Sequence, residues 1–238
     1  SIIESRYFRE DGKLITDNIF PKGYLPGDDI FANLIIPENL YIVGTVNMDD
    51  TTFSFSRKVL DRANTIEFSD VRLEYLDFEI EDDIEPLMLG NNWFRTRFIS
   101  IKDALVSDKD YVVKINNRIV AINNILAMGN KHFGYRVRDE IVFYMLENKK
   151  HSLLDENVAF DYQIMQKVLP AITGSDRVIK DILIHLYNYC NPDGEIIDGI
   201  NYIEMGEQNL ETALYERTAS KILMMLRGYE DGFASYWQ

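Results

Sequence analysis

Apolar residues recur at helical spacing through the second half of the chain, and this periodicity limits the possible folds more than any other feature. It predicts five helices, separated by turn signals such as Gly129, Gly134 and Pro170. A short strand is expected at 200–205, before the last helix, and the aromatic end of the chain is expected to dock on the rest of the protein. The apolar faces consist of Val112, Ile115, Ile119, Ile122 and Leu126; Val137, Ile141, Tyr144 and Met145; Phe160, Ile164, Val168 and Leu169; Val178, Ile182, Leu186 and Tyr189; and Leu214, Ile222, Leu223 and Leu226.

The first third of the chain has a different pattern, centred on residues 40–68. Residues 40–46 are apolar and rich in β-branched side chains, which is typical of a central strand buried on both faces. The run ends at Asn47, and an acidic, hydroxyl-rich turn, a short helix and a second strand at 65–68 are expected to follow. Ligands bind beyond the carboxyl ends of strands in parallel α/β sheets, so Asn47 is predicted to face a ligand.

Turn-forming residues and acidic residues divide the rest of the chain. Residues 7–39 hold short apolar runs between Gly and Pro, which predicts short strands or a β-hairpin. Residues 69–88 are strongly acidic and are interpreted as a solvated connector. The expected organisation is an α/β portion at 1–70, an acidic connector at 71–107 and a helical domain at 108–238.

Charge and cysteine content restrict the function and the compartment. The net charge of -14 repels phosphate backbones, so direct nucleic-acid binding by this chain is disfavoured. The single cysteine, Cys190, excludes a disulfide framework and favours a reducing, cytoplasmic setting. No apolar run reaches the ~18 residues of a membrane span, and the start of the chain has no signal peptide. The chain begins as if within a helix, which suggests a piece of a longer protein.

Several kinds of catalytic site are absent from the sequence. There is no G-x-x-x-x-G-K-[ST] and no G-x-S-x-G, and the three histidines lack metal-ligand spacing, so no metal site is expected. What remains is Asn47 followed by arginines. In phosphoryl transfer a polar side chain orients the attacking water, and an arginine neutralises charge on the γ-phosphate. From spacing alone, a turn residue and an exposed helix face are the simpler interpretations of these residues.

A family resemblance favours the functional interpretation of these residues over the simpler one. The segments YIVGTVNMDD and VLDRANTIEF resemble the sensor-1 strand, the following helix and the next strand of AAA+ nucleotidases. The match is closer still to the McrB-type AAA+ proteins of modification-dependent restriction systems. NKHFGYRVRDEI resembles the lid helix that carries sensor 2, while FDYQIMQKVLP, KILMML and DGFASYW resemble the C-terminal helices of the same group. The resemblance covers most of the chain.

The resemblance implies a role for individual residues. Arg136 and Arg138 of the lid helix are both candidates for sensor 2. On a helix they point about 200° apart, so only one of them can reach a given phosphate. At Thr51 many McrB-type members have an arginine, so the preference for GTP is left open. The implied roles are sensor 1 for Asn47, arginine finger for Arg62 with Arg57 as second candidate, sensor 2 for Arg136 with Arg138 as the alternative, and the acidic turn for Asp49 and Asp50.

The resemblance also implies a fold and a function. The chain would be the C-terminal part of an AAA+ core plus a helical lid, without the Walker motifs. The intact protein would hydrolyse Mg-bound GTP or ATP in a ring, most simply a hexamer, and power a McrC-like nuclease on DNA, which it would contact through parts outside this chain. The chain alone is expected to be inactive and to hold no nucleotide. The alternatives are a non-catalytic helical interaction module on an AAA+-like scaffold, or an α/β enzyme with a different site.

Overall fold

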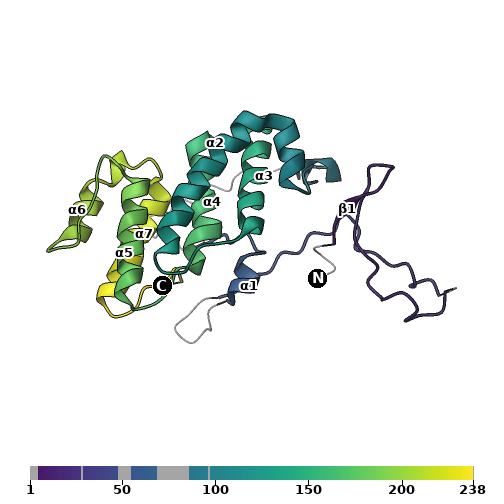
Figure 1. The fold of residues 1–238 in the computed structure, drawn as a ribbon, viewed down its shortest axis with the longest axis horizontal. Helices are drawn as coiled ribbons and strands as arrows, with labels where there is room; N and C mark the ends of the chain where they lie inside the picture. The colour runs from purple at the N-terminus through teal and green to yellow at the C-terminus, as the bar shows by residue number, and fades with distance from the viewer. Residues whose placement is uncertain (1–4, 28, 48–54, 69–85, 96, 238) are drawn as a thin grey trace. The chain divides into compact units, whose positions relative to one another are not determined.

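Helices dominate the part of the chain that the computed structural model describes, which comprises residues 5–27, 29–47, 55–68, 86–95 and 97–237. Figure 1 shows their arrangement. The elements are β1 (Tyr7–Phe8), β2 (Leu14–Ile15), α1 (Arg57–Leu60), the 3-10 turn η2 (Asn91–Trp93), α2 (Ile101–Ala127), α3 (Tyr135–His151), α4 (Glu156–Gln163), the π-turn η3 (Ile164–Val168), the 3-10 turn η4 (Leu169–Ala171), α5 (Arg177–Cys190), α6 (Tyr202–Gln208), the 3-10 turn η5 (Leu210–Thr212) and α7 (Glu216–Glu230).

The chain divides into two compact units. One contains residues 1–45 and 70–99, and the other contains residues 46–69 and 100–238. The first unit includes the predicted hairpin: β1 and β2 pair antiparallel, with Tyr7 opposite Ile15. Gly12 in the connecting turn has φ of 77°, a conformation that glycine adopts without the steric cost of a Cβ atom.

The predicted central strand at 40–46 is wrong in the structure. These residues are irregular, and their apolar side chains are exposed, with Ile42 at 76% and Val43 at 89%. Residues 65–68 are irregular as well. A buried strand needs neighbours that satisfy its backbone groups, and among the described residues the only ladder is the one between β1 and β2. Residues 40–46 therefore have the β-branched composition of a buried strand but are irregular in the structure.

Helix boundaries follow local capping chemistry. The Ser100 side chain and the Asp103 carboxylate form a capping box at the start of α2. At Asp108 the backbone leaves the helical region (φ -157°, ψ 85°), and the carboxylate accepts a hydrogen bond from the Tyr111 N–H at 3.1 Å. Asp108 thus caps the second, longer part of α2, which is where the sequence predicted the helix to begin. The earlier residues 101–107 form a helical segment that was not predicted.

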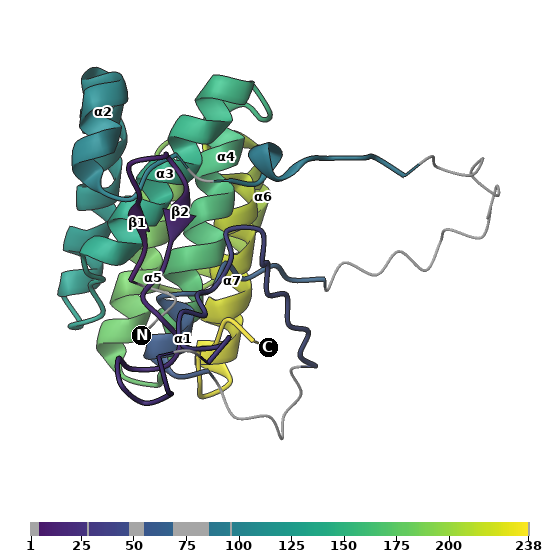
Figure 2. The same ribbon diagram turned by 90° about the vertical axis from the view of Figure 1, so that its right-hand side faces the viewer.

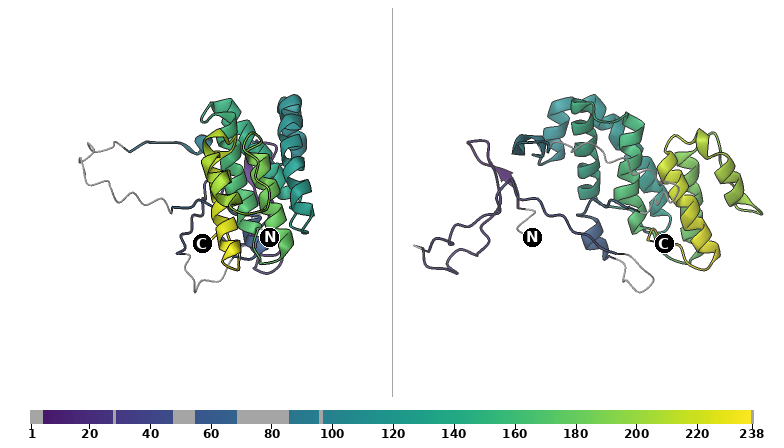
Figure 3. Two further views of the ribbon diagram at one scale, coloured as in Figure 1. Left: turned by 90° about the vertical axis from the view of Figure 1, so that its left-hand side faces the viewer. Right: turned by 180° about the vertical axis from the view of Figure 1, so that it is seen from behind.

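The helices of the second unit form a bundle with one apolar core. Figures 1 and 2 show α3, α4, α5 and α7 side by side, and α5 packs against both α2 and α7. α6 lies at the outer edge of the bundle against α7 (Figure 3). The predicted apolar faces are buried or half-buried, except for Val178 and Leu214, which lie at or before the first turn of α5 and α7. The apolar pattern therefore identified the core.

Two further predictions have opposite outcomes. The strand predicted at 200–205 is wrong, because α6 begins at Tyr202 and buries Tyr202 and Ile203 beneath it. The predicted docking of the C-terminal tail is confirmed: Ala234 forms a backbone bridge with Gly174, and Tyr236 is buried. The bridge holds the C-terminal tail against the bundle.

Candidate functional site

The first candidate arginine lies on the short helix α1. Leu60 is the buried residue of α1, and within the second unit α1 packs against η4. The Arg57 guanidinium donates a hydrogen bond to the carbonyl of Lys131 at 3.1 Å and another to the carbonyl of His132. Lys131 and His132 belong to the loop that leads into α3. The structure therefore brings Arg57 next to the segment that carries the predicted sensor-2 arginines.

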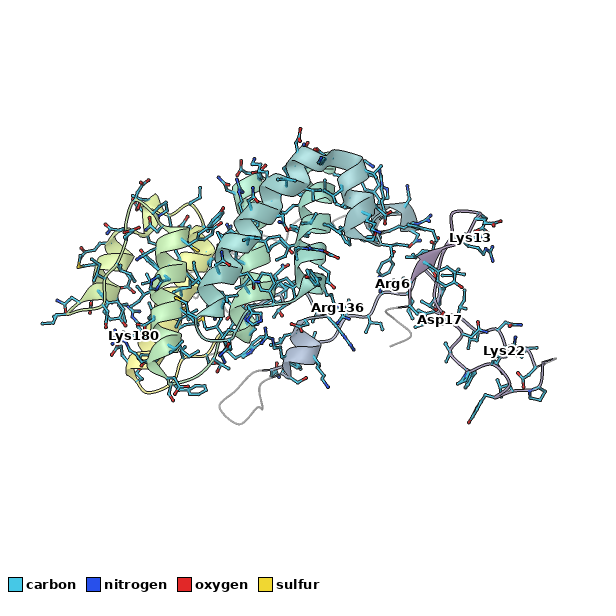
Figure 4. All side chains as sticks on the ribbon, in the orientation of Figure 1. Arg6, Lys13, Asp17, Lys22, Arg136 and Lys180 are labelled. Carbon is cyan, nitrogen blue, oxygen red and sulfur yellow. The ribbon has the colours of Figure 1, made fainter. Side chains whose placement is uncertain are left out.

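The two lid arginines differ in their surroundings. Arg136 is exposed in the first turn of α3, at the end nearest the α1 contact (Figure 4). Arg138 pairs with Asp139, with Nε to Oδ1 at 2.7 Å, and its guanidinium lies 4.9 Å from the centre of the Tyr135 ring. Arg138 is thus neutralised within its own helix. Arg136 is the more exposed of the two side chains.

The start of α3 adds to the positive character of this region. Its N-cap is Gly134, which supplies no side-chain cap, and the first turn holds no acidic residue. The backbone N–H groups of a first turn carry partial positive charge. Arg57, His132 and Arg136 are exposed around this turn. A basic surface thus exists in a chain whose net charge is -14.

The remaining predicted residues are less closely associated. Arg62 follows α1 and is exposed, and Asn47 is exposed on irregular backbone rather than at the end of a strand. Asp50 and its neighbour Asp49 lie outside the described residues. The structure thus places Arg57 against the loop before the helix that carries Arg136, and it gives Asn47 none of the strand-end geometry that the sequence predicted.

Cavities and metal-binding geometry do not lead to another site. One open cavity of about 430 Å³ is lined by residues of α2, α3 and the start of α4, and one of about 260 Å³ lies beside Lys180 and Tyr202. Neither is lined by a predicted site residue. Within the described residues, no group of His, Cys, Asp and Glu side chains is arranged to hold a metal ion.

A polar cluster away from α1 surrounds Lys180 on α5 (Figure 4). The Lys180 ammonium lies 2.6 Å from Asp198 Oδ1 and 2.6 Å from Glu230 Oε1, and 4.7 Å from the centre of the Tyr202 ring. Burial lowers the pKa of Lys180, but the hydrogen bonds to the two carboxylates outweigh this, and the net pKa is raised. The cluster ties the loop before α6 to α5 and α7.

Acid should weaken this cluster. Hydrogen bonds from Lys180 lower the pKa of Asp198 and Glu230 below their ordinary values of 3.8 and 4.5. A lowered folded-state pKa adds stability above the ordinary pKa, and that stability is lost as the pH falls through the folded-state value. We expect the wild type to lose about 1 kcal/mol more than Lys180→Met between about pH 5 and pH 2, allowing for solvent screening. Urea unfolding at several pH values measures this, and equal losses would contradict it.

Besides Lys180, sequence reasoning missed two further buried lysines, Lys167 and Lys221. Each interrupts an apolar stretch: Lys167 lies between Ile164 and Val168, and Lys221 directly precedes Ile222. Such an interruption was the available signal, because a buried ammonium group requires partners. Both lysines bind the segment that carries Arg57 and Arg62.

The comparisons with known proteins add one family. Residues 79–233 match the family described as Domain of unknown function (DUF8727). No curated protein matches the chain, and no solved structure does. The matched region contains α2 to α7 with Arg136 and Arg138, and excludes Asn47, Arg57 and Arg62. None of the described helices is both long and apolar enough to cross a membrane. Because the match covers more than half of its residues, the chain belongs to the DUF8727 family.

Proposed function

We propose that this chain is the C-terminal part of an AAA+ nucleoside triphosphatase, made of the end of the α/β core and a helical lid. The observation that carries the proposal is the contact between Arg57 and the loop before α3. It joins the arginine-bearing helix α1 to the helix that bears Arg136, the two elements to which the McrB-type resemblance assigns the arginine finger and sensor 2. The helical bundle is also the architecture expected of the lid.

The residues would divide the work of phosphoryl transfer. Arg136, beside the uncapped first turn of α3, would contact phosphate oxygens of the nucleotide bound by its own subunit. Arg62 would reach the nucleotide of a neighbouring subunit and neutralise the charge that develops on the γ-phosphate. Arg57 is engaged with backbone carbonyls and would hold α1 in place. Asn47, which follows the irregular residues 40–46, would orient the attacking water.

The remaining parts of the proposed triphosphatase would lie outside this chain. The phosphate-binding loop and the Mg²⁺ ligands would belong to the preceding part of the intact protein, and GTP or ATP would be the substrate. Identical subunits would form a ring, most simply a hexamer, in the cytoplasm. The ring would drive a McrC-like nuclease on DNA, contacted through other domains. The resemblance alone supports these partners.

The 238-residue chain should not bind nucleotide tightly. Most phosphate contacts of such enzymes come from the P-loop backbone and its lysine, which this sequence lacks. Titration calorimetry with Mg-GTP and Mg-ATP should show dissociation constants weaker than about 1 mM, the affinity of roughly -4 kcal/mol that a few ionic contacts supply. Tight binding of either nucleotide by residues 1–238 would refute this division of labour.

One observation favours a second function, that of an interaction module. Residues 181–216 contain eight acidic residues and no Lys or Arg, and the loop before α6 exposes Ile197 and Ile200. An apolar surface surrounded by acidic groups suits a basic protein partner. The sequence that precedes residue 1 in the gene distinguishes the two functions. A G-x-x-x-x-G-K-[ST] there favours the triphosphatase, and its absence favours the module.

A further inference from the structure

The segment comprising residues 55–68, here called the arginine segment, is irregular apart from α1, yet buried lysines hold it in place. The first of these is Lys167, on the π-turn η3. Its side chain has no exposed surface, and its ammonium donates a hydrogen bond to the carbonyl of Ala63 at 2.8 Å. It also pairs with Glu140 on α3. One cation therefore joins η3, α3 and the arginine segment.

The second anchor is Lys221 on α7. Its side chain is 6% exposed, and its ammonium lies 2.7 Å from Glu67 Oε1 and 4.6 Å from the centre of the Tyr236 ring. Tyr236 is itself buried, and burial together with the charge of Glu67 raises the pKa of its hydroxyl. A charge pair, an aromatic face and the C-terminal tail thus meet at the end of the arginine segment.

Apolar contacts complete the attachment. Leu60 is buried, and the Phe55 ring lies edge-on to Trp237 with centroids 5.9 Å apart. The two lysines are the costly part of this arrangement, because a buried ammonium that loses its partner keeps its desolvation cost. Moving the arginine segment away from the helices would remove the Ala63 carbonyl from Lys167 and the carboxylate from Lys221. The low-energy motion is therefore one in which the segment and helices move together.

We propose that Lys167 and Lys221 are positioning residues that make the arginine segment move as one body with α3, η3 and α7. Any rotation of the helices then displaces Arg57 and Arg62 by the same rotation. The attachment rests on the contacts above. Its consequence for catalysis rests on the proposed function, in which a turn of the lid would set the position of the arginine finger.

Limited trypsin digestion tests the attachment, because the arginine segment contains three cleavage sites, after Arg57, Lys58 and Arg62. In the 238-residue protein, Lys167→Met and Lys221→Met together should raise cleavage at these sites about tenfold or more, since cleavage follows the population of the detached segment. Mass spectrometry identifies the sites, and circular dichroism monitors the bundle. Cleavage at the wild-type rate would overturn the proposal.

A matched control separates detachment from general loss of stability. Lys180→Met also removes a buried lysine with two carboxylate partners, but none of them belongs to the arginine segment. It should leave cleavage in the arginine segment at the wild-type rate. If the double variant does not fold, Glu67→Gln in the folded chain gives the same test at one anchor. Equal cleavage in Glu67→Gln and the wild type would then overturn the proposal.

Turnover of the intact protein tests the positioning role. Lys221→Met should lower kcat about tenfold with little change in KM, because transition-state contacts are lost while nucleotide binding is retained. Lys180→Met should leave both parameters near the wild type. An unchanged kcat in Lys221→Met, with the segment shown to be detached, would overturn the positioning role. An intact wild type without hydrolysis would instead overturn the proposed function, and the digestion would still decide the attachment.

Discussion

Arg62→Ala in the intact protein should abolish nucleotide turnover and spare nucleotide binding. An arginine that neutralises γ-phosphate charge in the transition state contributes about 10³- to 10⁵-fold to kcat. Its loss acts on the transition state, because the phosphate cradle and Arg136 would still hold the ground-state nucleotide. Steady-state hydrolysis and equilibrium binding of a fluorescent nucleotide measure the two effects separately.

Lys58→Ala is the matched control for Arg62→Ala. Lys58 is an exposed cation on α1, on the same arginine segment, and has no proposed contact with nucleotide. Its removal should change kcat by less than about threefold, the effect of an exposed charge. Mixed rings of Arg62→Ala and P-loop-defective subunits would recover activity if the arginine acts across the interface. Arg62→Ala activity near the wild type would show that the finger assignment is wrong.

Asp161→Ala should destabilise the bundle strongly. The buried Asp161 carboxylate accepts hydrogen bonds from the backbone N–H groups of Arg217 at 3.0 Å and Thr218 at 2.9 Å, and from the Thr218 hydroxyl at 2.5 Å. It thereby caps α7 from a different helix. Removing it orphans two backbone donors, while the Thr218 hydroxyl keeps the Asp161 carbonyl as an acceptor at 3.2 Å. The loss should cost about 3 kcal/mol. In a domain of this size that lowers Tm by about 10 °C.

Asp155→Ala is the control for this prediction. Asp155 caps α4 by accepting one hydrogen bond, from the Asn157 N–H at 2.9 Å, and its side chain is exposed. Its loss should cost about 1 kcal/mol or less, because water replaces the lost partner. Differential scanning calorimetry of both variants compares the two caps directly. Similar Tm values for the two variants would mean that burial does not increase the contribution of the Asp161 cap to stability.

The helical half of the fold was predictable because the evidence for it is local. Apolar spacing and turn residues act within a few residues of each other, so the faces containing Ile115, Ile141 and Ile222 could be identified in advance. Strand predictions depend on partners far along the chain. Residues 40–46 have the composition of a strand but no neighbouring strand among the described residues, and residues 200–205 became part of α6 once Tyr202 was buried.

The candidate site was predictable only in part, for the same reason. The motifs identified Arg57, Arg62 and Arg136, but no local pattern shows that Arg57 binds the loop before α3. The anchors were harder to find, because a lysine among apolar residues is equally consistent with a side chain that reaches solvent. Only the three-dimensional arrangement shows that Lys167 and Lys221 meet the arginine segment.

The attachment of the arginine segment has a consequence for the order of folding. Lys221 and Glu67 are 154 positions apart, and Phe55 meets Trp237 near the other end of the chain. Closing such long loops costs chain entropy before any contact can compensate for it. The pairing of α2 with α3, which are neighbours in sequence, carries no such delay. We therefore expect the arginine segment to dock on a bundle that has already formed, so that its correct placement would report complete folding.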